Sequence, residues 1–173
     1  LGIAQYLSRI GLLIDGNTGE SLKAAKQSWM EDPVWQPLRK HCEDSFVVQD
    51  WFELFVAQNL VTDGLLYPLV YGRFAGELSQ TGGAVVSMLT EFMDEWYAES
   101  VKWVDAFVKT AAAESPENKH LLSQWVRDGI ASTTEALTPL AKLMYLEDAQ
   151  PALDEARAAL LARVAKTGLH VHT

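Results

Sequence analysis

Two glutamates that lie three positions before a nitrogen-bearing side chain are the clearest candidates for chemistry in this sequence. Glu117 precedes His120, and Glu99 precedes Lys102. Residues three apart share one face of a helix, so a Glu-x-x-His pair can present a carboxylate and an imidazole to the same metal ion. A di-iron bundle needs two such pairs and one further Glu from each of two other helices. The chain offers one literal pair.

The other histidines do not supply a second pair. His41 has no Glu three positions before it, and His170 and His172 lie in the C-terminal tail. The pair Glu117–His120 directly follows Ser115-Pro116, where a helix start favours an acidic side chain through the helix dipole. We interpret this pair as a solvated helix start, and we expect no metal and no cofactor to be bound by this chain.

The remaining candidate groups also favour a structural interpretation. A Lys102 ammonium cannot ligate a metal, so we expect it to pair with Glu99, and we treat the two as a candidate relic of a ligand pair. His41 and Cys42 are adjacent, and adjacent helical residues point in different directions, so we expect a structural cysteine and no activated thiol. The sequence has no glycine-rich phosphate loop, Gly-x-Ser-x-Gly or Cys-x-x-Cys motif. We therefore expect no catalytic residue.

The composition excludes several classes of partner. Hydrophobic residues make up 49% of the 173 residues, which is typical of a globular protein, and 23 acidic residues against 14 basic ones give a formal net charge of −9. This charge argues against binding to nucleic acid or to an anionic membrane surface. No uncharged run approaches the roughly 18 apolar residues that a membrane span needs. The single cysteine excludes an internal disulfide, and we expect a cytoplasmic protein.

Apolar spacing predicts an all-α protein without a sheet. We expect the second helix to be capped by Thr18, a third to begin at Asp32-Pro33 and restart near Gln36 because of Pro37, and a loop over 80–83. Pro68 and Gly72 are expected to bend the long central helix, and Gly168 to end the last one. The predicted helices cover residues 1–14, 18–30, 37–78 (running through Asp50 and Trp51), 84–113, 115–145 and 148–168.

The central helix carries apolar side chains in nearly every direction between residues 46 and 69. A surface helix needs only one apolar stripe, so this helix either lies at the centre of the domain or faces another chain. If Trp51 is buried, its replacement by Ala should cost about 3–5 kcal/mol, and if it is exposed the cost should be small. The candidate core or subunit-contact residues are Trp51, Phe52, Phe55, Leu65, Leu66, Tyr67, Trp96 and Trp103.

Seven segments, in order along the chain, resemble one protein family. The chain is similar to the C-terminal half of the β subunit of the oxygenase component of bacterial multicomponent phenol hydroxylases, which are relatives of the toluene and soluble methane monooxygenases. The resemblance extends over nearly the whole chain. The segments are 5–13 (QYLSRIGLL), 32–36 (DPVWQ), 43–47 (EDSFV), 50–54 (DWFEL), 57–61 (AQNLV), 63–66 (DGLL) and 88–93 (MLTEFM).

This resemblance implies a ferritin-like bundle of long antiparallel helices without a metal centre. It implies that residues 1–173 form one helical domain of a longer subunit, which supports an iron-bearing α subunit. In such systems two copies each of α, β and γ assemble, and a regulatory protein and a reductase with flavin and an iron–sulfur centre complete the system. The α subunit uses O₂ and NADH-derived electrons to hydroxylate phenols to catechols. The alternatives are an autonomous ferritin-like metal-binding protein and a helical module for a small apolar ligand.

Overall fold

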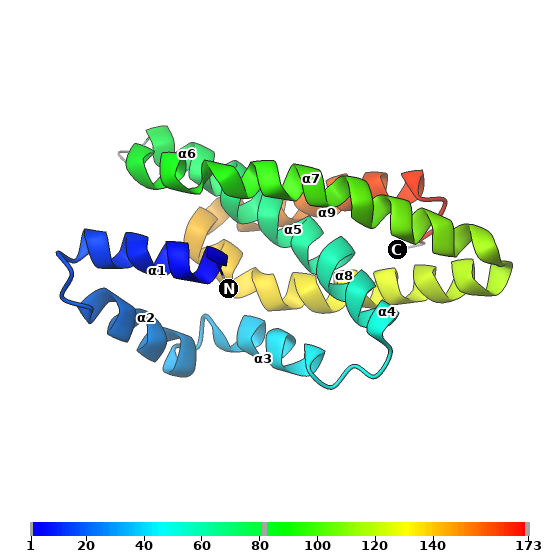
Figure 1. The fold of residues 1–173 in the computed structure, drawn as a ribbon, viewed down its shortest axis with the longest axis horizontal. Coiled ribbons are helices and arrows are strands. Elements are labelled where there is room, and N and C mark those ends of the chain that lie inside the picture. Colours follow the sequence, from blue (N-terminus) through cyan, green and yellow to red (C-terminus); the bar gives the residue numbers. More distant parts are fainter. Residues whose placement is uncertain (1, 81–82, 172–173) are drawn as a thin grey trace.

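The computed structural model describes residues 2–80 and 83–171, and within them it contains helices and connecting turns but no β-strand. The expected all-α architecture is therefore confirmed. Two long helices, α7 (Ala84–Glu114) and α8 (Pro116–Tyr145), form an antiparallel pair, and α9 (Ala149–Lys166) returns along them (Figure 1). Residues 81, 82 and 172 lie outside the described residues, so the predicted loop at 80–83 is covered only in part and the position of His172 is not described.

The turn between α7 and α8 follows from local chemistry that the sequence predicted. The Ser115 hydroxyl oxygen accepts a hydrogen bond from the Asn118 backbone N–H at 3.0 Å, and Pro116 occupies the first helical position, where no amide is needed. Near the same end of the bundle (Figure 1), Gly168 takes a left-handed φ of 87° just after α9, as expected for a glycine that ends a helix.

A third layer crosses this bundle diagonally (Figure 1). It runs through α4 (Trp51–Phe55), the π-helix η1 (Val56–Thr62), α5 (Asp63–Tyr67), the π-helix η2 (Pro68–Phe74) and α6 (Ala75–Gln80). η2 begins at Pro68, which has no amide to donate to the preceding turn. From Val56 to Leu69 this segment is buried on several sides, whereas Trp51 at its start is exposed. Its fully buried side chains are Val56, Leu60, Val61, Leu65 and Leu69.

The central helix is shorter than the sequence predicted. The preceding helix, α3 (Gln36–Ser45), ends at Ser45, and an irregular stretch follows before α4 begins. Asp50 accounts for the break, because its Oδ1 accepts hydrogen bonds from the Phe52 and Glu53 amides at 2.7 and 3.3 Å. Asp50 therefore caps a new helix instead of lying within a continuous one. Apolar periodicity alone could not reveal this interruption.

The expected helix start at Asp32-Pro33 is also wrong. α2 (Glu20–Glu31) ends just before it, and Asp32 Oδ1 accepts from the Val34 amide at 3.0 Å, which stabilises a turn. The restart at Gln36 is confirmed, with Pro37 in the first turn of α3.

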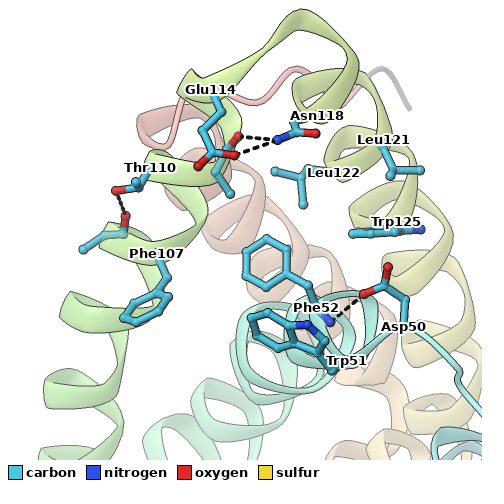
Figure 2. Close-up of a pocket in the computed structure, with 12 residues that line it drawn as sticks. Asp50, Trp51, Phe52, Phe107, Thr110, Glu114, Asn118, Leu121, Leu122 and Trp125 are labelled. Carbon is cyan, nitrogen blue, oxygen red and sulfur yellow. Dashed lines mark hydrogen bonds between the residues drawn. The ribbon is translucent and has the colours of Figure 1, made fainter.

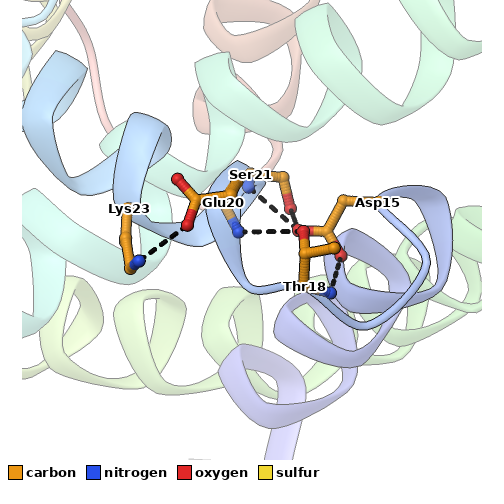
Figure 3. A network of polar contacts seen from close by, with 5 residues as sticks. All are labelled: Asp15, Thr18, Glu20, Ser21 and Lys23. Atoms are coloured by element: carbon orange, nitrogen blue, oxygen red, sulfur yellow. Dashed lines mark hydrogen bonds and ion pairs between the residues drawn. The ribbon is translucent and has the colours of Figure 1, made fainter.

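The α1–α2 hairpin is closed by a network around Asp15 (Figure 3). α1 (Gly2–Ile14) is followed by a tight turn, and Asp15 Oδ2 accepts from the Ser21 amide at 2.9 Å and from its hydroxyl at 2.7 Å. These bonds lower the pKa of Asp15. Thr18 was the expected cap, but its hydroxyl accepts only from the Glu20 amide at 3.3 Å, and Gly19 stands directly before α2. Asp15 therefore performs the capping from outside the helix.

No helix in the described part of the chain has both the length and the apolar character that crossing a membrane requires.

Candidate functional site

Five aromatic side chains from α4 and α7 form a continuous row at the surface, which we call the aromatic row: Trp51, Phe52, Phe55, Trp103 and Phe107. The ring centroids are 5.1 Å apart for Trp51 and Phe52 and 5.5 Å apart for Phe52 and Phe55, which stack. Phe55 then contacts Trp103 at 5.6 Å and Phe107 at 6.0 Å. The row therefore joins the N-terminus of α4 to α7.

The aromatic row is only partly covered. Phe52 and Phe55 are half-buried, whereas Trp51 is 72% exposed, Phe107 is 57% exposed and Trp103 is 43% exposed. Trp51 is the first residue of α4 after the Asp50 cap, which holds its ring at the edge of the bundle. Trp51 is therefore not a core residue of the described chain.

An open groove adjoins this row, between the N-terminus of α4, the C-terminal half of α7 and the start of α8. It has a volume of about 650 Å³. In Figure 2, Trp51 and Phe52 of α4 form one side of the groove. Phe107 of α7 lies opposite the α8 side chains, which are Leu121, Leu122 and Trp125. The polar groups are Asp50, Thr110, Glu114 and Asn118, and Glu114 Oε2 accepts from Asn118 Nδ2 at 3.1 Å.

The groove has the chemistry of a binding surface. No His, Cys, Lys or Arg is among the described residues that line it. Its walls are mostly aromatic and aliphatic, with two carboxylates at the edge. Such a surface can bury an apolar group and hold a cation.

The other candidate residues fall into two further places. Leu65 is in the core and Leu66 packs against it at partial burial. Tyr67 is buried and stacks on Tyr97 with centroids 5.1 Å apart, and it also contacts Trp96 at 5.6 Å. The eight residues singled out in the sequence therefore divide among the aromatic row, the core and a second aromatic cluster around Tyr67.

A buried polar cluster lies beside Tyr67. Arg163 of α9 donates from Nε to Asp105 Oδ1 at 2.7 Å and from Nη1 to the Tyr97 hydroxyl at 3.2 Å. Asp63 is buried nearby, and this burial raises its pKa to about 6, opposed by hydrogen bonds from Gln58 and Asn59 and by the charge of Arg163. The burial of Tyr67, with a smaller contribution from the Asp63 charge, raises the pKa of the Tyr67 phenol.

The two candidate ligand pairs lie at the surface of α7 and α8. Lys102 Nζ lies 2.6 Å from Glu99 Oε2, with both side chains exposed, so the expected ion pair is present. Glu117 and His120 are exposed at the first turns of α8. Over residues 2–80 and 83–171, no three His, Cys, Asp or Glu side chains gather closely enough to hold a metal ion. The donor set present therefore does not fit a di-iron centre.

His41 and Cys42 point to different environments. His41 Nε2 lies 3.0 Å from the Thr62 hydroxyl oxygen and 3.4 Å from that of Thr133, so the imidazole links α3 to η1 and α8. Burial lowers the pKa of His41. Burial also raises the pKa of the Cys42 thiol, with the Glu43 charge adding to the effect, which favours the unreactive protonated form.

Comparison with known proteins gives the family. The model of the Methane/Phenol/Alkene Hydroxylase family matches residues 1–115. The chain belongs to this family. The chain is 54% identical over 98% of its length to the oxygenase component of phenol 2-monooxygenase from Pseudomonas sp. (strain CF600), of which it covers 50%. It is 48% identical, again over 98% of its length, to the corresponding component from Acinetobacter pittii (strain PHEA-2), of which it covers 50%.

A solved structure of this hydroxylase family also matches the fold. The xenon-pressurized phenol hydroxylase from Pseudomonas sp. OX1 superposes with a TM-score of 0.93 and 48% identity over 99% of this chain and 52% of that one. This match confirms the expected ferritin-like bundle. The chain spans about half the length of the curated relatives it matches.

Sequence reasoning missed several residues of the site. Phe107 lies four positions after Trp103 on α7, so a search for an apolar stripe with helical spacing could have found it. Leu121, Leu122 and Trp125 belong to α8, and nothing local to their segment indicates that they face Trp51. Arg163 was also missed, because its partners Tyr97 and Asp105 are about 60 residues away in sequence.

Proposed function

We propose that this chain is part of a non-catalytic, β-type subunit of the oxygenase component of a phenol-hydroxylating monooxygenase. Its role is to hold the iron-bearing α subunit, in which O₂ and reductase-derived electrons convert phenols to catechols. The γ subunit, a second copy of the assembly, a regulatory protein and an NADH-dependent reductase are the further partners. The observation that carries the proposal is the exposed aromatic row on a member of this hydroxylase family.

The exposure of the row supports an assembly role. Proteins that act alone rarely leave contiguous large apolar surfaces in water, and such surfaces mark contact sites. Trp is also enriched among the residues that dominate binding energy at interfaces. Trp51, Trp103 and Phe107 lie in one connected set of rings, so a partner that covers them would bury a single continuous apolar surface.

The available donor groups support a division of labour between subunits. The Glu99–Lys102 pair has an ammonium where a Glu-x-x-His pair would present an imidazole, and Glu117 and His120 lie in solvent at a helix start. We therefore assign the iron to the companion subunit. The candidate relic at Glu99–Lys102 is part of the same proposal.

A module for a small apolar ligand is less well supported. The groove volume is within the range of ligand pockets, but such pockets bury most of the ligand surface. Here the side of the groove at Trp51 is open to water, and the aromatic row continues beyond the groove to Trp103. A small ligand would leave that surface exposed.

Metal analysis of the separated subunits tests the proposal. The full-length protein is produced together with its companion subunits, the oxygenase is purified, and the subunits are separated and analysed for iron and for phenol hydroxylation after reassembly. We expect iron in the larger companion, and activity only when both are present. Stoichiometric iron in the polypeptide that contains this chain, or full activity of the companion alone, would contradict the proposal.

The variant His120→Ala supplies a second readout. His120 is exposed and lies outside the groove and the aromatic row, so we expect assembly and hydroxylation rates close to those of the unmodified protein. Loss of turnover with retained folding and assembly would place His120 in the reaction and would overturn the non-catalytic assignment.

A further inference from the structure

We propose that the groove between α4, α7 and α8 receives an amphipathic segment of the companion subunit, in which an apolar side chain is flanked by Lys or Arg. This inference rests on the proposed function and specifies the partner chemistry at one surface. It combines three properties of the groove, namely its apolar walls, its two carboxylates, which form no ion pair within the described residues, and its continuity with the aromatic row.

The walls of the groove favour an apolar side chain. Trp51 and Phe52 form one wall and Phe107 faces them from α7, while Leu122 and Trp125 contribute from α8 (Figure 2). A volume of about 650 Å³ accommodates one or two large side chains of a partner. Interface pockets of this kind, lined by aromatic rings and closed off from water on binding, hold the residues that contribute most to affinity.

The charges at the edge favour a basic neighbour for that side chain. Asp50 and Glu114 both line the groove, none of its described lining residues is basic, and neither carboxylate forms a salt bridge within residues 2–80 and 83–171. A wholly apolar segment laid over the groove would remove water from these charges without replacing it, which costs free energy. A Lys or Arg on the segment supplies the missing partner.

Arginine satisfies both requirements of the site. Its planar guanidinium can donate two hydrogen bonds to a carboxylate and can also stack on an aromatic ring. Asp50 and Glu114 line the same groove as Trp51 and Phe107, so the groove offers both kinds of group that a guanidinium binds.

Continuity with the aromatic row favours a protein segment as the occupant. The rings extend from Trp51 in the groove through Phe55 to Trp103 outside it. A segment several residues long covers the groove and the row at once, whereas a single small molecule covers only the groove. A net charge of −9 argues against nucleic acid.

Photo-crosslinking in the assembled oxygenase tests the occupant directly. The photoreactive residue p-benzoylphenylalanine replaces Leu121, which lines the groove and is exposed, in the full-length protein. The matched control places it at Leu143, an exposed position of the same helix outside the groove. We expect position 121 to crosslink to a companion peptide that contains a large apolar residue beside Lys or Arg, and position 143 not to yield that peptide.

Other crosslinking results would overturn the inference. These are a crosslink from position 121 only to the same polypeptide or to a second copy of it, a crosslink to a companion peptide without a basic residue, and the absence of any crosslink in an intact assembly. If the assembly forms normally in these cases, the groove inference fails while the proposed function stands. If no iron-containing companion binds at all, both fail.

A charge reversal provides the second test. We expect Glu114→Lys to weaken binding of the companion about tenfold or more, and Glu114→Gln to weaken it less and to reduce its salt dependence. Glu135→Lys is the control, because Glu135 is exposed on α8 outside the groove. Equal effects of Glu114→Lys and Glu135→Lys would show a general charge effect and would contradict a specific basic partner.

A third variant guards against misfolding. Phe107→Ala removes an exposed ring, so helical content and thermal unfolding should stay close to those of the unmodified protein while affinity for the companion falls about tenfold or more. Unchanged affinity with Phe107→Ala would remove the groove from the interface.

Discussion

Gly64 on α5 lies directly against Leu160 on α9, and a Cβ atom added to Gly64 would stand 2.8 Å from Leu160 Cδ1. Both residues are buried, so a side chain at residue 64 would require the enclosed Leu160 side chain to shift. We expect Gly64→Ala to lower the free energy of unfolding by about 1–3 kcal/mol through overpacking. Urea unfolding followed by circular dichroism measures this change.

Gly76→Ala is the matched control for this substitution. Gly76 is also in a helix, but a Cβ there meets nothing within 4 Å. Alanine is the better helix former, so we expect no loss of stability and a gain of up to about 1 kcal/mol. Equal destabilisation by the two substitutions would rule out the contact with Leu160 as the cause.

The ion pair between Arg163 and Asp105 links α9 to α7. Arg163 is 11% exposed and also donates to the Tyr97 hydroxyl, so removing it leaves the half-buried Asp105 carboxylate without its ion-pair partner and the half-buried Tyr97 hydroxyl without this donor. We expect Arg163→Met to lower the free energy of unfolding by about 2–4 kcal/mol. Arg127→Met is the control, because Arg127 pairs with its neighbour Asp128 at the surface. Its cost should be below about 0.5 kcal/mol, and a similar cost for both would contradict the role of the buried pair.

The raised pKa of Asp63 gives the protein a specific pH dependence. Its folded pKa of about 6 lies above the reference value of 3.8, so between these values the folded protein holds a proton that the unfolded chain has lost. The contribution of Asp63 to stability is therefore greatest below the lower value and is lost as pH rises through about 6, by up to about 3 kcal/mol. Asp63→Asn, which cannot titrate, should remove this fall in the free energy of unfolding with rising pH.

Urea unfolding at several pH values between about 4.5 and about 7.5 measures the Asp63 effect, since this range spans most of the titration. The unmodified protein should lose stability relative to Asp63→Asn as pH rises. Glu135→Gln, at an exposed position of α8, should leave the profile of the unmodified protein unchanged. Parallel profiles for the unmodified protein and Asp63→Asn would show that Asp63 does not titrate in this range.

Replacing Trp51 should have little effect on the stability of the protein, although we propose that this residue contributes to assembly. Its side chain is 72% exposed, so Trp51→Ala should change the free energy of unfolding by less than about 0.5 kcal/mol, in contrast to the several kcal/mol expected of a buried Trp. Leu65→Ala is the comparison within the same central segment, because Leu65 is fully enclosed and should cost about 2–5 kcal/mol. A large cost for Trp51→Ala would show that its ring is covered within the protein itself.

Much of the helical pattern could be predicted because caps and prolines act locally. Ser115-Pro116, Pro37 and Gly168 each satisfy or interrupt backbone hydrogen bonds within a few residues, so their effect is visible in the sequence. Asp50 acts in the same local way, yet the surrounding apolar residues continue the periodic pattern on both sides of the break. The prediction of one continuous helix therefore failed there.

The sequence indicated several residues of the candidate site but did not indicate whether they are buried or exposed. Trp51, Phe52, Phe55 and Trp103 stood out as aromatic residues on apolar helices, but whether each is buried depends on which helices cover it. Phe52 and Phe55 are partly covered, whereas Trp51, at the first position of α4, is exposed and lines the groove. Residue type indicates how much surface must be covered, and not what covers it.

The sequence by itself determined the all-α class and the main helix boundaries after residue 84, because these follow from local hydrogen bonding and periodicity. Only the tertiary structure decided three further features. Arg163 donates hydrogen bonds to Asp105 and Tyr97, and Gly64 packs against Leu160. Helices α4, α7 and α8 line a groove that includes Asp50 and Glu114. These contacts join residues far apart in the chain, and the free energy of packing that selects them is a property of the whole bundle.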